Sequence, residues 1–84
     1  MISEYVEAAM EQATYEMIDD EEPFYADIPQ LPGVWATGTT LEGCRRTLRE
    51  VLEGWIIVRL RKGLAIPPID DWTIEPPREL EVRG

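Results

Sequence analysis

The sequence predicts an α+β fold in which a sheet packs on one long helix, in the order β-β-β-α-β after an extra N-terminal helix. Residues 14–18 and 24–28 alternate in the manner of strands across a polar turn. Residues 34–38 suit a third strand, and apolar residues then recur at a spacing of three or four up to Gly63. The right-handed crossover rule places a last strand parallel to the first and beside it, which predicts a mixed four-stranded sheet of order 3-2-1-4.

The N-terminal helix is predicted over residues 3–12. Ser3 can cap it, and the early glutamate Glu4 favours the positive end of the helix dipole. Its apolar face is predicted to carry Tyr5, Val6, Ala9, Met10 and Ala13. A helix this short needs something to pack against.

A hairpin follows, with the turn predicted at residues 19–22. Met17 then lies opposite Phe24 and Tyr15 opposite Ala26. One face of the hairpin carries Ala13, Tyr15, Met17, Phe24, Ala26 and Ile28. The other face carries Thr14, Glu16, Tyr25 and Asp27.

The loop at residues 28–33 brings the chain back as a third antiparallel strand. Pro29 and Pro32 restrict this loop, because each proline fixes φ and removes a backbone donor. Trp35 points either toward the core or away from it, since a slip of one residue exchanges the two faces of a strand.

The long helix begins at Thr39 or Thr40 and ends at Gly63. Thr39 followed by Glu42 makes a capping box, although Thr40 could serve as the cap instead. Arg61 and Lys62 suit the negative end of the dipole, and Gly63 can take the left-handed conformation that ends a helix. The apolar face is predicted to carry Leu41, Cys44, Leu48, Val51, Leu52 and Trp55.

The end of this helix is too apolar for a surface helix. A helix of about 23 residues is about 34 Å long, whereas strands of about five residues extend only about 17 Å, so the sheet cannot cover its last turns. The residues left for another partner are Ile56, Ile57, Val58 and Leu60. The N-terminal helix could cover part of them, but Ile57 lies on the far side and predicts a homodimer or a higher even-numbered assembly.

Residues 72–75 are predicted as the fourth strand, which Pro76 and Pro77 bound at its end. The whole chain, residues 1–84, is then one domain, with an N-terminal helix extension at 1–12, a core at 13–75 and a tail at 76–84. The tail alternates weakly at Leu80 and Val82, which is compatible with a loose tail or an added edge strand.

Charge and composition limit the possible partners. The 84 residues include 17 acidic and 8 basic side chains, a formal net charge of −9. Without a basic stripe, direct nucleic-acid binding is not expected, whereas a basic protein partner would be attracted. The lone Cys44, the acidic N-terminus and the short apolar run predict a cytoplasmic protein with neither a disulfide nor a membrane span.

Catalysis is not predicted. The chain has no His, no nucleophile beside a base and no Gly-rich phosphate loop. Glu16 and Asp27 could share a face and residues 19–22 are acidic, which leaves a metal-dependent nuclease as a weaker alternative. The acidic cluster lies where a hairpin turn belongs, however, and acidic turns are ordinarily solvated, so no metal or cofactor site is expected.

Three segments together resemble the HicB-like antitoxins. They are Tyr-Ala-Asp-Ile-Pro-Gln-Leu-Pro-Gly at residues 25–33, Gly-Thr-Thr-Leu-Glu at 38–42, and Ile-Pro-Pro at 66–68. The resemblance covers residues 14–69. It implies a partial ribonuclease-H-like fold.

The resemblance also implies a function as an antitoxin. Proteins of this family neutralise HicA, a small basic toxin that cleaves messenger RNA, by covering its catalytic surface. The residues of this chain expected to contact such a partner are Tyr25, Asp27, Gln30 and Trp35. The alternative is a stand-alone oligomeric module, with the nuclease-like enzyme less favoured.

Overall fold

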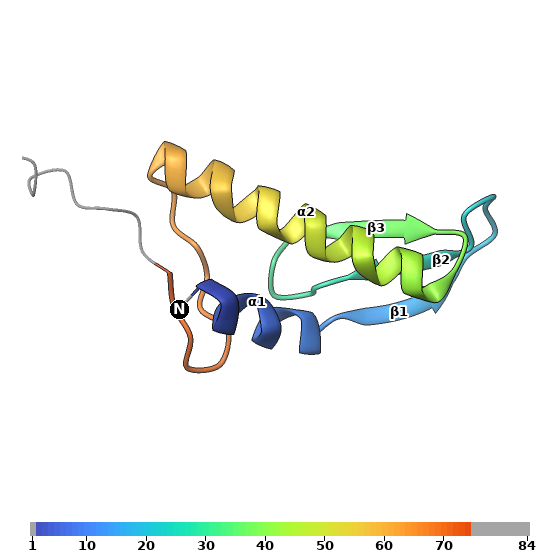
Figure 1. Cartoon of the computed structure of the whole chain (residues 1–84), viewed down its shortest axis with the longest axis horizontal. Coiled ribbons are helices and arrows are strands. Elements are labelled where there is room, and N and C mark those ends of the chain that lie inside the picture. The colour runs from blue at the N-terminus through green and yellow to red at the C-terminus, as the bar shows by residue number, and fades with distance from the viewer. Residues whose placement is uncertain (1, 75–84) are drawn as a thin grey trace, which may run out of the picture.

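The computed structural model describes residues 2–74 and shows two helices with a three-stranded antiparallel sheet (Figure 1). The helices are α1 (Ile2–Glu11) and α2 (Leu41–Lys62). The strands are β1 (Thr14–Met17), β2 (Phe24–Asp27) and β3 (Trp35–Gly38), paired in the order β1-β2-β3. The fold is thus α+β, with the element order α-β-β-β-α in the described residues.

The register of the hairpin agrees with the alternation in the sequence. Met17 pairs with Phe24 and Tyr15 with Ala26. In the next ladder, Ala26 pairs with Ala36 and Asp27 with Trp35. One face of the sheet therefore carries the buried Ala26 and Ala36, and Trp35 lies on the opposite face.

Helix α2 packs on β2 and β3 through small side chains. Cys44 is fully buried, and its Sγ donates to the carbonyl oxygen of Ala36 over 3.6 Å. A Cβ built on Gly38 would lie 2.7 Å from the backbone nitrogen of Cys44, so the first turn of α2 and the end of β3 can approach this closely only at a glycine. The core continues along α2 through Leu48, Leu52 and Ile56, each at most 2% exposed.

Both ends of α2 have defined caps. Thr40, not Thr39, is the N-cap, because its Oγ1 accepts a 2.9 Å hydrogen bond from the backbone N–H of Gly43. At the other end Gly63 has φ of 69°, and the N–H of Leu64 donates to the carbonyl oxygen of Arg59 over 2.9 Å. The predicted glycine stop is therefore confirmed.

Helix α1 lies along the part of α2 that extends past the strands (Figure 1). The apolar face predicted for it is buried, since Tyr5, Val6, Ala9 and Met10 are each at most 5% exposed. The hydroxyl of Tyr5 donates a 2.5 Å hydrogen bond to the carbonyl oxygen of Pro67. The segment after α2 is thereby held against α1.

The predicted fourth strand and the sheet order 3-2-1-4 are wrong for the described residues. Ile69 and Trp72 exchange backbone hydrogen bonds of 3.0 and 2.8 Å with each other, around a turn in which Asp70 has φ of 52°. Pro67 and Pro68 lack backbone donors, and the segment binds α1 instead of β1. Glu75, the end of that predicted strand, and the predicted tail at 76–84 lie outside the described residues.

Candidate partner-binding surface

The face of the sheet turned away from α2 is the candidate binding surface, here called the outer face. Neither of the two described helices packs on it, and all three strands contribute side chains. Its residues are Thr14, Glu16, Tyr25, Asp27, Trp35 and Thr37.

The centre of the outer face is an aromatic pair. The ring centroids of Tyr25 and Trp35 lie 6.1 Å apart with an angle of 28° between the ring planes. The register explains the contact, because Tyr25 pairs with Thr37 and Asp27 with Trp35, which makes the two aromatics diagonal neighbours on one face. The Trp35 side chain is 53% exposed, so much of its surface is free to be buried by a partner.

Carboxylates surround this pair. Asp27 Oδ1 accepts a 2.6 Å hydrogen bond from Thr14 Oγ1, and Glu22 Oε1 accepts one of 2.6 Å from Thr37 Oγ1. Glu16 is exposed and lies opposite Tyr25 in the β1–β2 ladder. Each carboxylate has further lone pairs that can accept hydrogen bonds from a partner.

The basic residues of the described chain all lie on α2. Residues 2–40 and 63–74 contain no Lys or Arg at all, whereas α2 carries six basic residues. Those six are Arg45, Arg46, Arg49, Arg59, Arg61 and Lys62. The outer face is consequently built only from elements without a basic residue, and its carboxylates make it the complement of a basic protein.

Gln30 lies at the end of the sheet where Asp27 pairs with Thr14. Its Nε2 donates a 3.1 Å hydrogen bond to Oε1 of Gln12, just after α1. The loop that carries it is held by short backbone hydrogen bonds and by Gly33, whose φ of 96° favours glycine. Together with Tyr25, Asp27 and Trp35, it completes the set predicted from the sequence, whose partner role stays a prediction.

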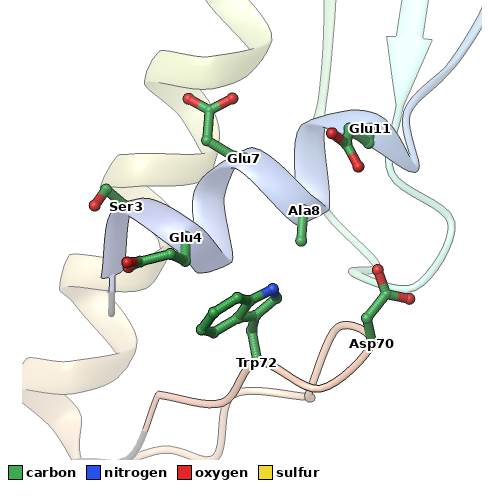
Figure 2. Close-up of a pocket in the computed structure, with 7 residues that line it drawn as sticks. All are labelled: Ser3, Glu4, Glu7, Ala8, Glu11, Asp70 and Trp72. Carbon is green, nitrogen blue, oxygen red and sulfur yellow. The ribbon is translucent and has the colours of Figure 1, made fainter.

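A second acidic and aromatic hollow lies beneath α1 (Figure 2). It has a volume of about 340 Å³ and is lined by Ser3, Glu4, Glu7, Ala8, Glu11, Asp70 and Trp72. Figure 2 shows the Trp72 indole alongside α1 and the Glu7 carboxylate turned to the other side of the helix. There Glu7 Oε2 lies 2.7 Å from Nη2 of Arg49 on α2.

The sequence did not reveal this hollow. The spacing of Glu4, Glu7 and Glu11 does indicate an acidic helix face. The missing information was the position of Trp72, because the turn from Ile69 to Trp72 depends on local hydrogen bonds and not on a strand ladder.

The residues predicted for self-association lie in different environments. Ile56 is only 2% exposed and belongs to the core of the protomer, and Leu60 is half-buried. Ile57 and Val58 are 51% and 50% exposed. An apolar hollow of about 320 Å³ lies beside Ile57, lined by Ile2, Glu53, Ile56, Ile57 and Leu60.

The acidic turn of the hairpin is solvent-exposed. Asp19, Asp20, Glu21 and Glu22 are all exposed, and Asp20 Oδ2 accepts a 3.2 Å hydrogen bond from the backbone N–H of Glu22. Within residues 2–74, no three metal-ligating side chains gather closely enough to hold an ion. Neither of the two described helices has an apolar stretch long enough to traverse a bilayer.

Comparison with known proteins places the chain among relatives. A family model described as UPF0150-like matches residues 4–67. The crystal structure of TTHA0281 from Thermus thermophilus is similar, with a TM-score of 0.86 and 47% sequence identity over 92% of this chain and 95% of that one. None of the curated proteins compared with the chain matches it. The chain therefore belongs to the UPF0150-like family, which is related to toxin–antitoxin proteins of the HicB type.

Proposed function

We propose that this protein is an antitoxin-type regulator that neutralises a small basic RNA-cleaving toxin of the HicA kind by covering its active surface. The observation that carries the proposal is the outer face, where the exposed Trp35 stacks on the half-buried Tyr25. Carboxylates surround this pair, and the elements that carry it contain no basic residue. Membership of a family related to toxin–antitoxin proteins supports the same function.

The aromatic pair would supply most of the binding energy. Buried Trp and Tyr side chains at the centre of an interface commonly contribute more than about 2 kcal/mol each, whereas exposed charges at the rim contribute little. Trp35 and Tyr25 are already stacked in the free protein, so little side-chain freedom remains to be lost on binding. Trp35 is therefore the expected anchor.

The carboxylates would raise the rate of association and make binding specific for a basic partner. A toxin that cleaves RNA must present a basic surface to phosphate groups. A protein with a net charge of −9 is attracted to that surface over long distances and competes with RNA for it. Association is thus expected to be fast at low salt and to slow as the salt concentration rises.

The direct test is co-expression with any small basic protein that a neighbouring reading frame encodes. The unmutated chain is expected to co-purify with that protein and to restore growth. Tyr25→Ala combined with Asp27→Lys is expected to weaken both effects while the circular dichroism spectrum stays unchanged, because both side chains lie on the outer face.

A matched variant separates this surface from general effects of charge. Asp71→Lys makes the same substitution as Asp27→Lys at an exposed position in the turn between Ile69 and Trp72, which is not part of the sheet. It is expected to leave co-purification intact. The proposal is wrong if no toxic neighbour exists, or if toxicity persists at full expression of the unmutated chain.

A further inference from the structure

One side of α2 faces away from the sheet and has no partner in the described residues. The buried positions Cys44, Leu48, Leu52 and Ile56 recur every four residues and define the side that faces the core. The opposite side carries Glu50, Gly54, Ile57 and Arg61, all of them exposed. These four residues, here called the outward stripe, follow the four-three-four spacing of residues that line one contact between two helices.

Nothing within the described part of the protomer explains why residue 54 is a glycine. A glycine in an exposed helix interior costs about 1 kcal/mol relative to alanine. A Cβ built on Gly54 would meet nothing within 4 Å, whereas one on Gly38 would meet the Cys44 backbone and one on Gly43 would lie 2.9 Å from Thr40 Oγ1. Gly33 and Gly63 have positive φ. A glycine beside the exposed Ile57 is instead what a closely approaching second helix requires.

The outward stripe is complementary to the same stripe on a second, antiparallel α2 helix. In an antiparallel pair of α2 helices, Glu50 lies opposite Arg61 of the second copy and Gly54 lies opposite Ile57 of the second copy. Because the pairing is symmetric, it places two ion pairs around two contacts in which an isoleucine fills the space above a glycine. We propose that the outward stripe is a homodimer interface and that its occupant is a second copy of this chain.

The flanks of the stripe suit this occupant. On one side lies an open, mainly apolar hollow of about 400 Å³, lined by Val51, Gly54, Trp55, Val58, Arg59, Lys62 and Leu64. Arg59 is fixed at its wall, because its guanidinium carbon lies 4.6 Å from the centre of the Trp55 ring and its Nη1 donates to the carbonyl oxygen of Ala65 over 3.0 Å. On the other side lies the apolar hollow beside Ile57. Both hollows would be covered by the second helix.

This interface refines the set predicted from the sequence and is independent of the proposed function. Ile57 stays in the contact and Val58 borders it, but Ile56 is already used by the core of the protomer. The outer face of the sheet lies on the other side of the molecule from the outward stripe. A dimer of this kind would therefore leave both copies of the aromatic pair accessible.

Charge reversal tests the pairing directly with the full chain. Glu50→Arg alone sets two positive charges against each other at each contact, because Arg61 of the second copy is unchanged. Arg61→Glu alone sets two negative charges against each other in the same way. Each single variant is expected to weaken self-association at least about tenfold. A mixture of the two single variants joins opposite charges at both contacts, the original pair at one and the exchanged pair at the other. The mixture is therefore expected to associate within about threefold of the wild type.

The double variant Glu50→Arg with Arg61→Glu exchanges the two charges within one chain. In a symmetric pair of such chains, both contacts again join opposite charges, so self-association is expected to return to within about threefold of the wild type. Restoration by a second charge reversal is not expected if each substitution acts only on the fold of its own protomer.

The readout is molar mass by light scattering at micromolar concentration, with circular dichroism to confirm folding. The wild type is expected at twice the 9.6 kDa of one chain, and each single variant near one chain mass. Arg45→Glu makes the same charge change as Arg61→Glu at an exposed position off the stripe and is expected to remain dimeric. A monomeric wild type overturns the proposal, as do dimeric single variants or a double variant that fails to associate.

Discussion

The hydroxyl of Tyr5 donates a 2.5 Å hydrogen bond to the carbonyl oxygen of Pro67, which joins α1 to the segment that follows α2 across 62 positions of sequence. Tyr5 is completely buried. This bond is the polar contact that fixes the last described segment beneath α1. It also explains why that segment does not reach the free edge of β1.

Removing this hydroxyl is expected to destabilise the protein. Tyr5→Phe leaves the Pro67 carbonyl without its donor at little cost in packing, so the free energy of unfolding should fall by about 1–2 kcal/mol. Tyr15→Phe is the control, because the Tyr15 side chain is 39% exposed, and its effect should stay within about 0.5 kcal/mol. Urea denaturation of both variants measures the difference, and equal midpoints would contradict it.

The same residue predicts a loss of stability at alkaline pH. Burial raises the pKa of Tyr5 above its ordinary value. The unfolded chain therefore loses this proton at lower pH than the folded protein does, so the stability is fully present below about pH 10 and declines as the pH rises beyond it. Tyr5→Phe should show a shallower decline than the wild type in melting curves recorded between neutral and alkaline pH.

The start of α2 gives a matched pair of substitutions. Thr40→Ala removes the hydroxyl that accepts from Gly43 N–H and should cost about 1 kcal/mol. Thr39→Ala, one residue earlier and also exposed, should change stability by less than about 0.5 kcal/mol. Thermal melts of the two variants distinguish them, and a larger effect at Thr39 would contradict the cap.

Cys44 is expected to be unreactive in the folded protein. Its thiol is buried against Ala36, and burial followed by the nearby charge of Glu22 raises its pKa, which reduces the thiolate fraction. Labelling by a thiol reagent at neutral pH should be at least about a thousandfold slower than in denaturant. The reason is that at most about one molecule in a thousand of a stable small domain is unfolded at any moment. Fast labelling of native protein would contradict this packing.

The sequence predicts the local structure well where the signal is local. Alternation across an acidic turn sets the register of Met17 with Phe24, and one glycine with basic neighbours ends α2 at Gly63. The choice between Thr39 and Thr40 could not be made, because both can cap and only the backbone geometry separates them. Tyr25 and Asp27 share a face as predicted.

The features that could not be predicted from the sequence depend on contacts between distant segments. The direction of Trp35 follows from the pairing of Ile28 with Val34 across the loop, where the Ile28 N–H donates over 3.2 Å. The predicted fourth strand failed because Tyr5 binds Pro67 and Trp72 pairs with Ile69, neither of which alternation can reveal. In the sequence, Gly54 looks like an ordinary helix position, and only the empty space around it in the structure sets it apart.

The most direct measurement of the central claim is calorimetric titration of the chain with an inactivated form of the basic protein that co-purifies with it in the co-expression test. Two exposed tryptophans provide the comparison, since Trp35 lies on the outer face and is 53% exposed, while Trp72 lies beneath α1 and is 40% exposed. Trp35→Ala is expected to weaken binding at least about tenfold, or about 1.4 kcal/mol, and Trp72→Ala to leave it within about twofold. Equal affinities for the wild type and Trp35→Ala, or a loss confined to Trp72→Ala, would contradict the assignment of the outer face as the binding surface.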